Sequence, residues 1–168
     1  MPFASTMGTG MCMAFPDVCK TPTPAGPVPI PYPNIAQLAM ANPATCATNV
    51  LIFNKPAATT MTIIMLSSGD EAGCAGGVVS QLFIGPAQFK LGSVVVSIQG
   101  APAVYQGSLI GQNGVGNANM PAGVQTVPSQ ACHGRALTAR SLHQFSSRSS
   151  LAAILPISRG AAGPHGVL

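Results

Sequence analysis

Charged residues are scarce in this sequence, at 6% of 168 residues, against about 25% in an ordinary soluble domain. It has three carboxylates, Asp17, Asp70 and Glu71, and all of its histidines lie beyond residue 130. General acid–base catalysis needs positioned pairs of such groups. We therefore expect the protein not to be an enzyme, and we interpret the adjacent Asp70 and Glu71 as residues of a turn.

Long apolar runs are missing as well. A membrane-spanning helix needs about 18 to 20 apolar residues in succession, and the longest runs here, residues 50–53 and 63–66, are far shorter. The N-terminal segment lacks the basic region and the continuous apolar stretch of a secretory signal peptide. We expect no stable membrane insertion, and a protein made in the cytoplasm that leaves it only by a route other than general secretion.

Glycine and proline are abundant, with 19 and 16 residues. Both are unfavourable inside helices, and there are few charged residues for the exposed face of an amphipathic helix. Short apolar runs separated by Gly, Pro and Asn predict short β-strands. These runs are residues 49–53, 60–66, 77–84, 93–99 and 103–106. We expect a mainly β fold, a small compact domain of short strands.

A proline-rich segment occupies residues 16–33. Each proline fixes φ and removes an amide donor, so the segment must be extended and lie along an edge or a surface. Val28, Ile30 and Tyr32 alternate with the prolines and give it one apolar side. This pattern favours a strand packed on the core over a flexible linker.

Two further patterns concern single elements. Residues 34–42 give the one helical pattern of the body, with Asn34 as N-cap and Pro43 after its end, which predicts one short helix. In residues 93–99, Val94, Val96 and Ile98 occupy alternate positions. Alternation of this kind predicts a half-buried strand with these three side chains on its inner face.

The composition changes near residue 130. Before it, three lysines balance the three carboxylates, and the net charge of +4 comes from four arginines after it. We predict a domain over residues 1–130 and a basic Arg/Ser-containing tail over residues 131–168, flexible or partly helical between 136 and 154. A basic arm could bind nucleic acid, but these arginines form no dense patch, so we expect no nucleic-acid partner.

The chain has five cysteines, an odd number. Without a secretion signal, a disulfide framework is not expected. Cys12 and Cys19 are close enough in sequence to share a zinc ion, with Cys46 and Cys74 as further candidate ligands. The alternative is that each thiol is a small, buried, apolar-like side chain.

Four motifs follow one another in a characteristic order. They are GMCMAFPDVCKTP, PVPIPYPNIAQ, SSGDEAG with GGVVS, and GQNGVGNAN. In this order they resemble the PAAR-like (Tox-PAAR-like) family of type VI secretion, over about residues 3–130. The resemblance implies a conical β-domain that caps and sharpens a trimeric VgrG-type spike, one copy per trimer, and helps to attach or deliver an effector or adaptor. It also implies a bacterial cytoplasmic protein that is exported with the spike into the target cell or the medium.

The resemblance also bears on metal binding and on an alternative function. Members of the wider PAAR family hold a zinc ion near the point of the cone, largely through histidines. The body of this chain has no histidine, which leaves Cys12 and Cys19 as the candidate zinc ligands. The alternative function is a toxin that the PAAR-like body delivers and whose tail carries activity or an effector contact. Its chemistry would need Cys132, His133 and His143, and the tail has no carboxylate to orient a Cys–His pair.

Overall fold

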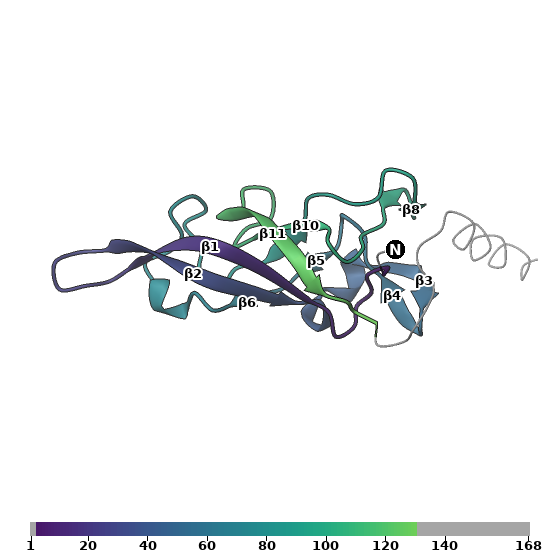
Figure 1. Cartoon of the computed structure of the whole chain (residues 1–168), viewed down its shortest axis with the longest axis horizontal. Coiled ribbons are helices and arrows are strands. Elements are labelled where there is room, and N and C mark those ends of the chain that lie inside the picture. The colour runs from purple at the N-terminus through teal and green to yellow at the C-terminus, as the bar shows by residue number, and fades with distance from the viewer. Residues whose placement is uncertain (1–2, 131–168) are drawn as a thin grey trace, which may run out of the picture.

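Two long antiparallel strands run along most of the domain in the computed structural model, which describes residues 3–130. The fold tapers from a broad end, built by β3, β4 and β8, to a narrow end formed by the turn between β1 and β2 (Figure 1). The predicted mainly β fold is confirmed. The strands are β1 (Met11–Thr21), β2 (Val28–Gln37), β3 (Ala47–Ile52), β4 (Lys55–Ala57), β5 (Ile63–Ile64), β6 (Ser67–Ser68), β7 (Ala87–Phe89), β8 (Ser97–Ile98), β9 (Ala101–Pro102), β10 (Leu109–Gln112) and β11 (Met120–Val127).

Seven of these strands form one antiparallel sheet in the order β5-β7-β10-β11-β1-β2-β6. The two edge strands, β5 and β6, are separated in sequence only by residues 65–66. The two edges of the sheet must therefore lie near each other, and the sheet curls until it almost closes into a barrel. Strands β3 and β4, and β8 and β9, pair as two separate hairpins at the broad end (Figure 1).

The prolines of β2 fit the sheet because of their spacing. Pro29, Pro31 and Pro33 occupy every second position of β2, and the first two pair with Lys20 and Val18 of β1. In an antiparallel strand, alternate residues direct their N–H groups to opposite edges, so all three missing donors face away from β1. The outer neighbour β6 pairs only with Ile35 and Ala36, beyond the last proline. The predicted extended backbone of residues 16–33 is confirmed in part: residues 16–21 lie in β1 and residues 28–33 in β2, and a turn divides them.

The core is built largely from small side chains. The main cluster includes Cys12, Leu38, Ile64, Phe89 and Ile110, together with several alanines. A second cluster at the broad end contains Ala47, Ala57, Val96, Ile98 and Ala103. Within residues 3–130, no helix is long and apolar enough to cross a membrane.

The helix predicted for residues 34–42 is wrong. Asn34 lies in β2, paired with Ala14 of β1, and only the single 3₁₀ turn η1 (Leu38–Met40) follows. Pairing of β2 with β1 therefore overrides the weak local helical pattern. Two further 3₁₀ turns are η2 (Pro43–Thr45), capped by Asn42, and η3 (Glu71–Gly73).

The predicted strands are confirmed only in part. Residues 49–53 fall largely in β3, whereas 60–66 and 93–99 contribute only two-residue strands. Residues 77–84 form no strand, because Gln81 and Ile84 adopt positive φ and turn the chain. Residues 103–106 make only isolated bridges.

One predicted burial pattern is also wrong in part. Val96 and Ile98 are buried as expected, but Val94 is 99% exposed. The backbone N–H groups of Val95 and Val96 both donate to the Ser93 hydroxyl. That turn directs Val94 outward instead of continuing the strand. The predicted tail over residues 131–168 lies outside the described residues.

Candidate functional site

A cluster of polar side chains is enclosed in the narrow half of the domain. We call it the Asp17 cluster, and its members are Asp17, Cys19, Asn34, Asp70, Asn113 and Asn119. All of them are buried. They come from β1, from β2, from the turn before η3 and from the loop between β10 and β11. These segments are the four sequence motifs, which the fold therefore brings to one place.

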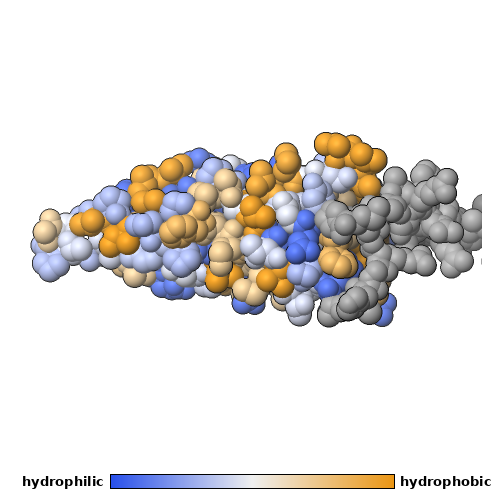
Figure 2. All heavy atoms as spheres, in the orientation of Figure 1, coloured by the Kyte–Doolittle hydropathy of each residue, from blue (hydrophilic) through white to orange (hydrophobic). Residues whose placement is uncertain are grey.

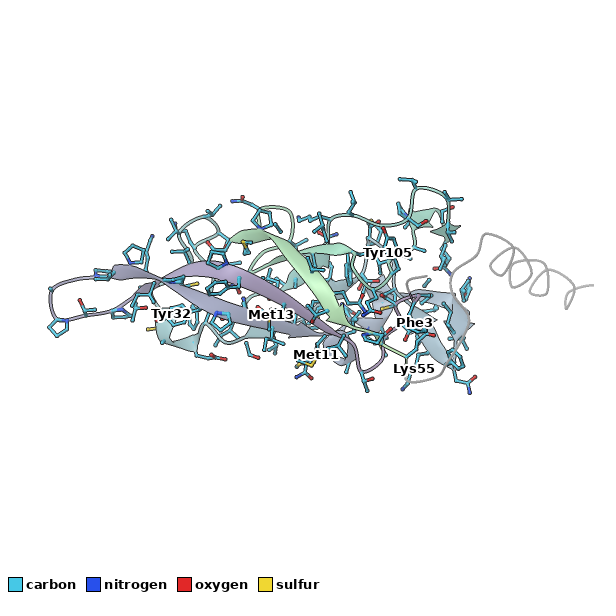
Figure 3. The ribbon with its side chains drawn as sticks, viewed as in Figure 1. Phe3, Met11, Met13, Tyr32, Lys55 and Tyr105 are labelled. Carbon is cyan, nitrogen blue, oxygen red and sulfur yellow. The ribbon has the colours of Figure 1, made fainter. Side chains whose placement is uncertain are left out.

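A β-bulge directs Asp17 into this cluster. Cys12 and Ala14 face the interior, and regular alternation would place residue 16 inside and residue 17 outside. The register of β1 against β2 shifts between Ala14 and Asp17, so that Phe15 and Pro16 are both exposed and Asp17 is buried. Asp17 pairs with Tyr32, which Figure 3 shows well towards the narrow end.

Asp17 accepts hydrogen bonds from three asparagine side chains. The Nδ2 atoms of Asn34 and Asn113 each lie 2.8 Å from Asp17 Oδ2. The Nδ2 atom of Asn119 donates to Asp17 Oδ1. Amide donors therefore stabilise this buried carboxylate, as buried polar groups require. The nearby Lys20 ammonium instead donates to Gln81 on the surface.

Asp70 is held in a similar way. Asn113 Nδ2 donates to Asp70 Oδ2 at 2.6 Å, and the Ile84 backbone N–H lies 3.3 Å from both carboxylate oxygens. The Cys19 thiol donates to Asp70 Oδ2 at 3.5 Å. Asn113 thus bridges the two carboxylates of the cluster, Asp17 and Asp70. Asp70 is buried, and Glu71 beside it is exposed, so the predicted turn places the two carboxylates in different surroundings.

Backbone contacts fix the orientation of the two loop asparagines. Asn113 Oδ1 accepts from the Gly85 N–H at 2.7 Å and from the Ser67 hydroxyl at 3.1 Å. Asn119 Oδ1 accepts from the Val79 N–H at 2.8 Å. Because each amide oxygen is engaged by N–H donors, each NH₂ group must face the carboxylates.

The cysteines predicted as zinc ligands do not come together. Cys12 and Cys19 lie on the same strand, and at about 3.3 Å per residue their separation is on the order of 20 Å. One ion cannot contact both thiols. Cys46 is buried near Thr62, and Cys74 is exposed. Among residues 3–130, no three His, Cys, Asp or Glu side chains form a group suited to a metal ion.

The surroundings of the buried thiols raise their pKa values. Burial raises the pKa of Cys12 to about 12. Burial, followed by the charges of Asp17 and Asp70 and the hydrogen bond to Asp70, raises the pKa of Cys19 to about 12. Burial also raises the pKa of Cys46. Thiolate is the nucleophilic and metal-binding form, and these surroundings disfavour it. Cys132, His133 and His143 lie outside the described residues.

The broad end presents exposed apolar side chains, which we call the base patch: Leu51, Phe53, Val94 and Val95. Val94 is 99% and Val95 75% exposed. Phe53 sits in the β3–β4 turn, where both central residues have positive φ, as in the type I′ turn of a tight hairpin. Figure 2 shows hydrophobic side chains gathered at the broad end over the region of β8. The resemblance predicts an exposed apolar patch at one end, but the alternation of residues 93–99 predicted Val94 to be buried, so the sequence did not identify which residues form this surface.

Gly69 is expected to be indispensable to the loop that carries Asp70. Its φ is 125°, and a Cβ there would overlap the Pro33 carbonyl oxygen. Gly69→Ala should lower the free energy of unfolding by about 3 kcal/mol, from backbone strain and overpacking together. Urea unfolding followed by circular dichroism measures this loss.

Gly26 provides the matched control. Its φ is 120°, yet no heavy atom lies within 4 Å of a Cβ built there. Gly26→Ala should therefore cost only the backbone term, about 1 kcal/mol. Equal losses in the two variants would contradict the close approach of Gly69 to Pro33.

Comparison with known proteins identifies one family. The family model described as Toxin PAAR-like domain matches residues 10–122. That range contains every member of the Asp17 cluster and the whole base patch. No curated protein and no solved structure matches the chain.

Proposed function

The chain belongs to the Toxin PAAR-like domain family, which associates it with type VI secretion, and we propose that it is the tip protein of a secretion spike. In this proposal it caps the blunt end of a trimeric VgrG-type spike, one copy per trimer. It is exported from the bacterial cytoplasm together with the spike, and it helps to attach or deliver an effector or adaptor. Its role is mechanical, and the chain is not an enzyme.

The observation that carries the proposal is the asymmetry of the two ends. The broad end exposes the base patch, with Val94 and Val95 outermost, and exposed apolar patches on soluble domains commonly mark protein interfaces. The body has zero net charge, since its lysines and carboxylates balance. Apolar contact therefore supports docking at this end better than electrostatic attraction does.

The narrow end has the rigidity that the tip of a spike needs. The turn between β1 and β2 is closed by the Thr23 and Gly26 backbones, whose N–H and C=O groups bond reciprocally at 2.9 and 3.2 Å. The Thr23 hydroxyl also donates to the Gly26 carbonyl at 2.6 Å. Prolines on both sides of the turn restrict the backbone. A tight, proline-flanked turn of this kind keeps its form without a large core beneath it.

Two of the three carboxylates of the body support a structural role. Asp17 and Asp70 are inaccessible to solvent, and both oxygens of each accept hydrogen bonds from within the protein. A general acid or base must reach a proton of its substrate. Neither carboxylate can do so while the cluster is intact.

The experiment that tests the function is size-exclusion chromatography with light scattering of the full chain mixed with its VgrG-type spike. We expect a complex whose mass exceeds that of the spike by one copy of this chain per trimer. Three copies per trimer would contradict seating at a single tip. No complex at micromolar concentrations would contradict the tip role and shift attention to the tail.

A further inference from the structure

The family resemblance implies a zinc ion near the point of the cone, and the side chains in the narrow half do not fit one. The candidate ligands there are Asp17, Cys19 and Asp70. Both oxygens of each carboxylate already accept hydrogen bonds from protein donors. We propose that this half of the domain is held together by amide-to-carboxylate hydrogen bonds instead of a metal ion, with Asn113 in the bridging position between Asp17 and Asp70.

The first argument is the chemistry of the groups that face the carboxylates. These groups are the NH₂ groups of Asn34, Asn113 and Asn119. An amide NH₂ donates hydrogen bonds and has no free lone pair, so it cannot coordinate a cation. It occupies the space around the carboxylates in which a metal ion would have to lie.

The second argument is that these amides cannot reverse at low cost. Turning Asn113 would direct its NH₂ group at the Gly85 N–H and remove the acceptor of that donor. Turning Asn119 would do the same to the Val79 N–H. A buried donor without an acceptor costs about 1–3 kcal/mol. A cation in the cluster would therefore require rearrangement of the β10–β11 loop and of the segment that carries Val79 and Gly85.

The third argument concerns the remaining ligand atoms. Cys19 donates its proton to Asp70 Oδ2, and burial together with the two carboxylates raises the pKa of this thiol. Asn34 Oδ1 is the one cluster oxygen without a hydrogen-bond partner. A single neutral oxygen falls short of the four ligands that a structural zinc site uses.

The bridging role of Asn113 explains how two carboxylates can share one buried site. Its NH₂ group has two hydrogens, and it donates to Asp17 at 2.8 Å and to Asp70 at 2.6 Å. Two carboxylates this close repel each other, and hydrogen-bond donors placed between them reduce that repulsion. In this domain the positive end of an amide dipole takes the place of a cation.

The direct test is elemental analysis of the full chain, purified without a metal-affinity tag from cells grown with added zinc. A companion variant, Cys132→Ser with His133→Ala, His143→Ala and His165→Ala, removes every cysteine and histidine beyond residue 130. We expect the companion variant to contain less than about 0.1 equivalent of any metal. We also expect its Tm to change by less than about 1 °C with EDTA. About one equivalent of metal in that variant, with a fall in Tm on chelation, would overturn the proposal.

A second test exchanges the bridging amide for a ligand. Asn113→Asp replaces the donor with a third carboxylate, so we expect the Tm to fall by about 8 °C or more and not to recover in zinc or calcium. Asn117→Asp, an exposed change in the same loop, should shift the Tm by less than about 2 °C. Recovery of Asn113→Asp by either metal would contradict the proposal. If this variant does not fold, the elemental analysis still decides.

Discussion

Asp17→Ala is expected to lower the free energy of unfolding by about 4 kcal/mol, because three buried amide groups each lose one acceptor at once. Asn34, Asn113 and Asn119 all donate to this carboxylate. An unsatisfied buried donor costs about 1–3 kcal/mol, and a domain of this size is stable by only about 5–15 kcal/mol. The loss therefore approaches the whole stability of the weakest such domains. Because the chain has no tryptophan, urea unfolding followed by circular dichroism is the suitable measurement.

Two further variants separate the roles of charge and of shape. Asp17→Asn keeps the size of the side chain and one acceptor oxygen but turns an NH₂ group towards other donors, so we expect a loss of about 2–3 kcal/mol. Glu71→Gln, an exposed change whose side chain contacts only the Gly69 N–H, should cost less than about 0.5 kcal/mol. A loss below about 1 kcal/mol in Asp17→Ala would show that the cluster does not hold the domain together.

The cluster joins segments that no local pattern connects. Asp17 and Asn119 are 102 residues apart in the sequence, and Asp17 and Asn113 are 96 apart. Each of these hydrogen bonds connects β1 to the loop between β10 and β11. Small side chains fill most of the core, so apolar burial is modest for each residue. Directional polar contacts therefore have a large share in fixing the relative positions of these loops.

Sequence reasoning predicted the class of fold and the family but not the site. Scarce charge together with abundant Gly and Pro disfavours helices whatever the order of residues, so the mainly β class followed from composition. The order of the four motifs indicated the family. The burial of Asp17 depends on the bulge between Ala14 and Asp17, which reverses the alternation of β1. Nothing in the local pattern marks that bulge.

The errors in secondary structure have the same origin. Residues 34–42 have a helical pattern, yet Asn34 is needed in β2, where its side chain reaches Asp17 across the hairpin. Residues 77–84 are apolar enough for a strand. In the structure, however, the Val79 N–H donates to the side chain of Asn119 and not to a neighbouring strand. One signal in the sequence did point to the cluster: all three carboxylates of the chain fall in the motifs that indicated the family, and two of them, Asp17 and Asp70, belong to the cluster.

Val94→Asp combined with Val95→Asp is expected to weaken binding to the spike at least about 100-fold, which corresponds to about 3 kcal/mol. The reason is that two carboxylates would enter an apolar contact without partners, and an unpaired buried charge is costly. Val94 is 99% exposed in the free domain, so the change should leave its Tm within about 2 °C. Isothermal titration of the variant into the spike measures the loss directly.

Met65→Asp is the control for this surface, because it places a carboxylate, one charge against two, at an exposed apolar position on the flank of the domain instead of the broad end. Met65 is 57% exposed and lies between β5 and β6, where Figure 1 shows the middle of the domain. We expect its affinity for the spike to stay within about threefold of the wild type.

If Met65→Asp weakened binding as much as the change at Val94 and Val95, the flank would belong to the interface. If neither change mattered, the broad end would not be the docking face, and the stiff narrow end could not be the exposed point. The pair of variants therefore fixes the orientation of the domain on the spike, which binding stoichiometry alone does not determine.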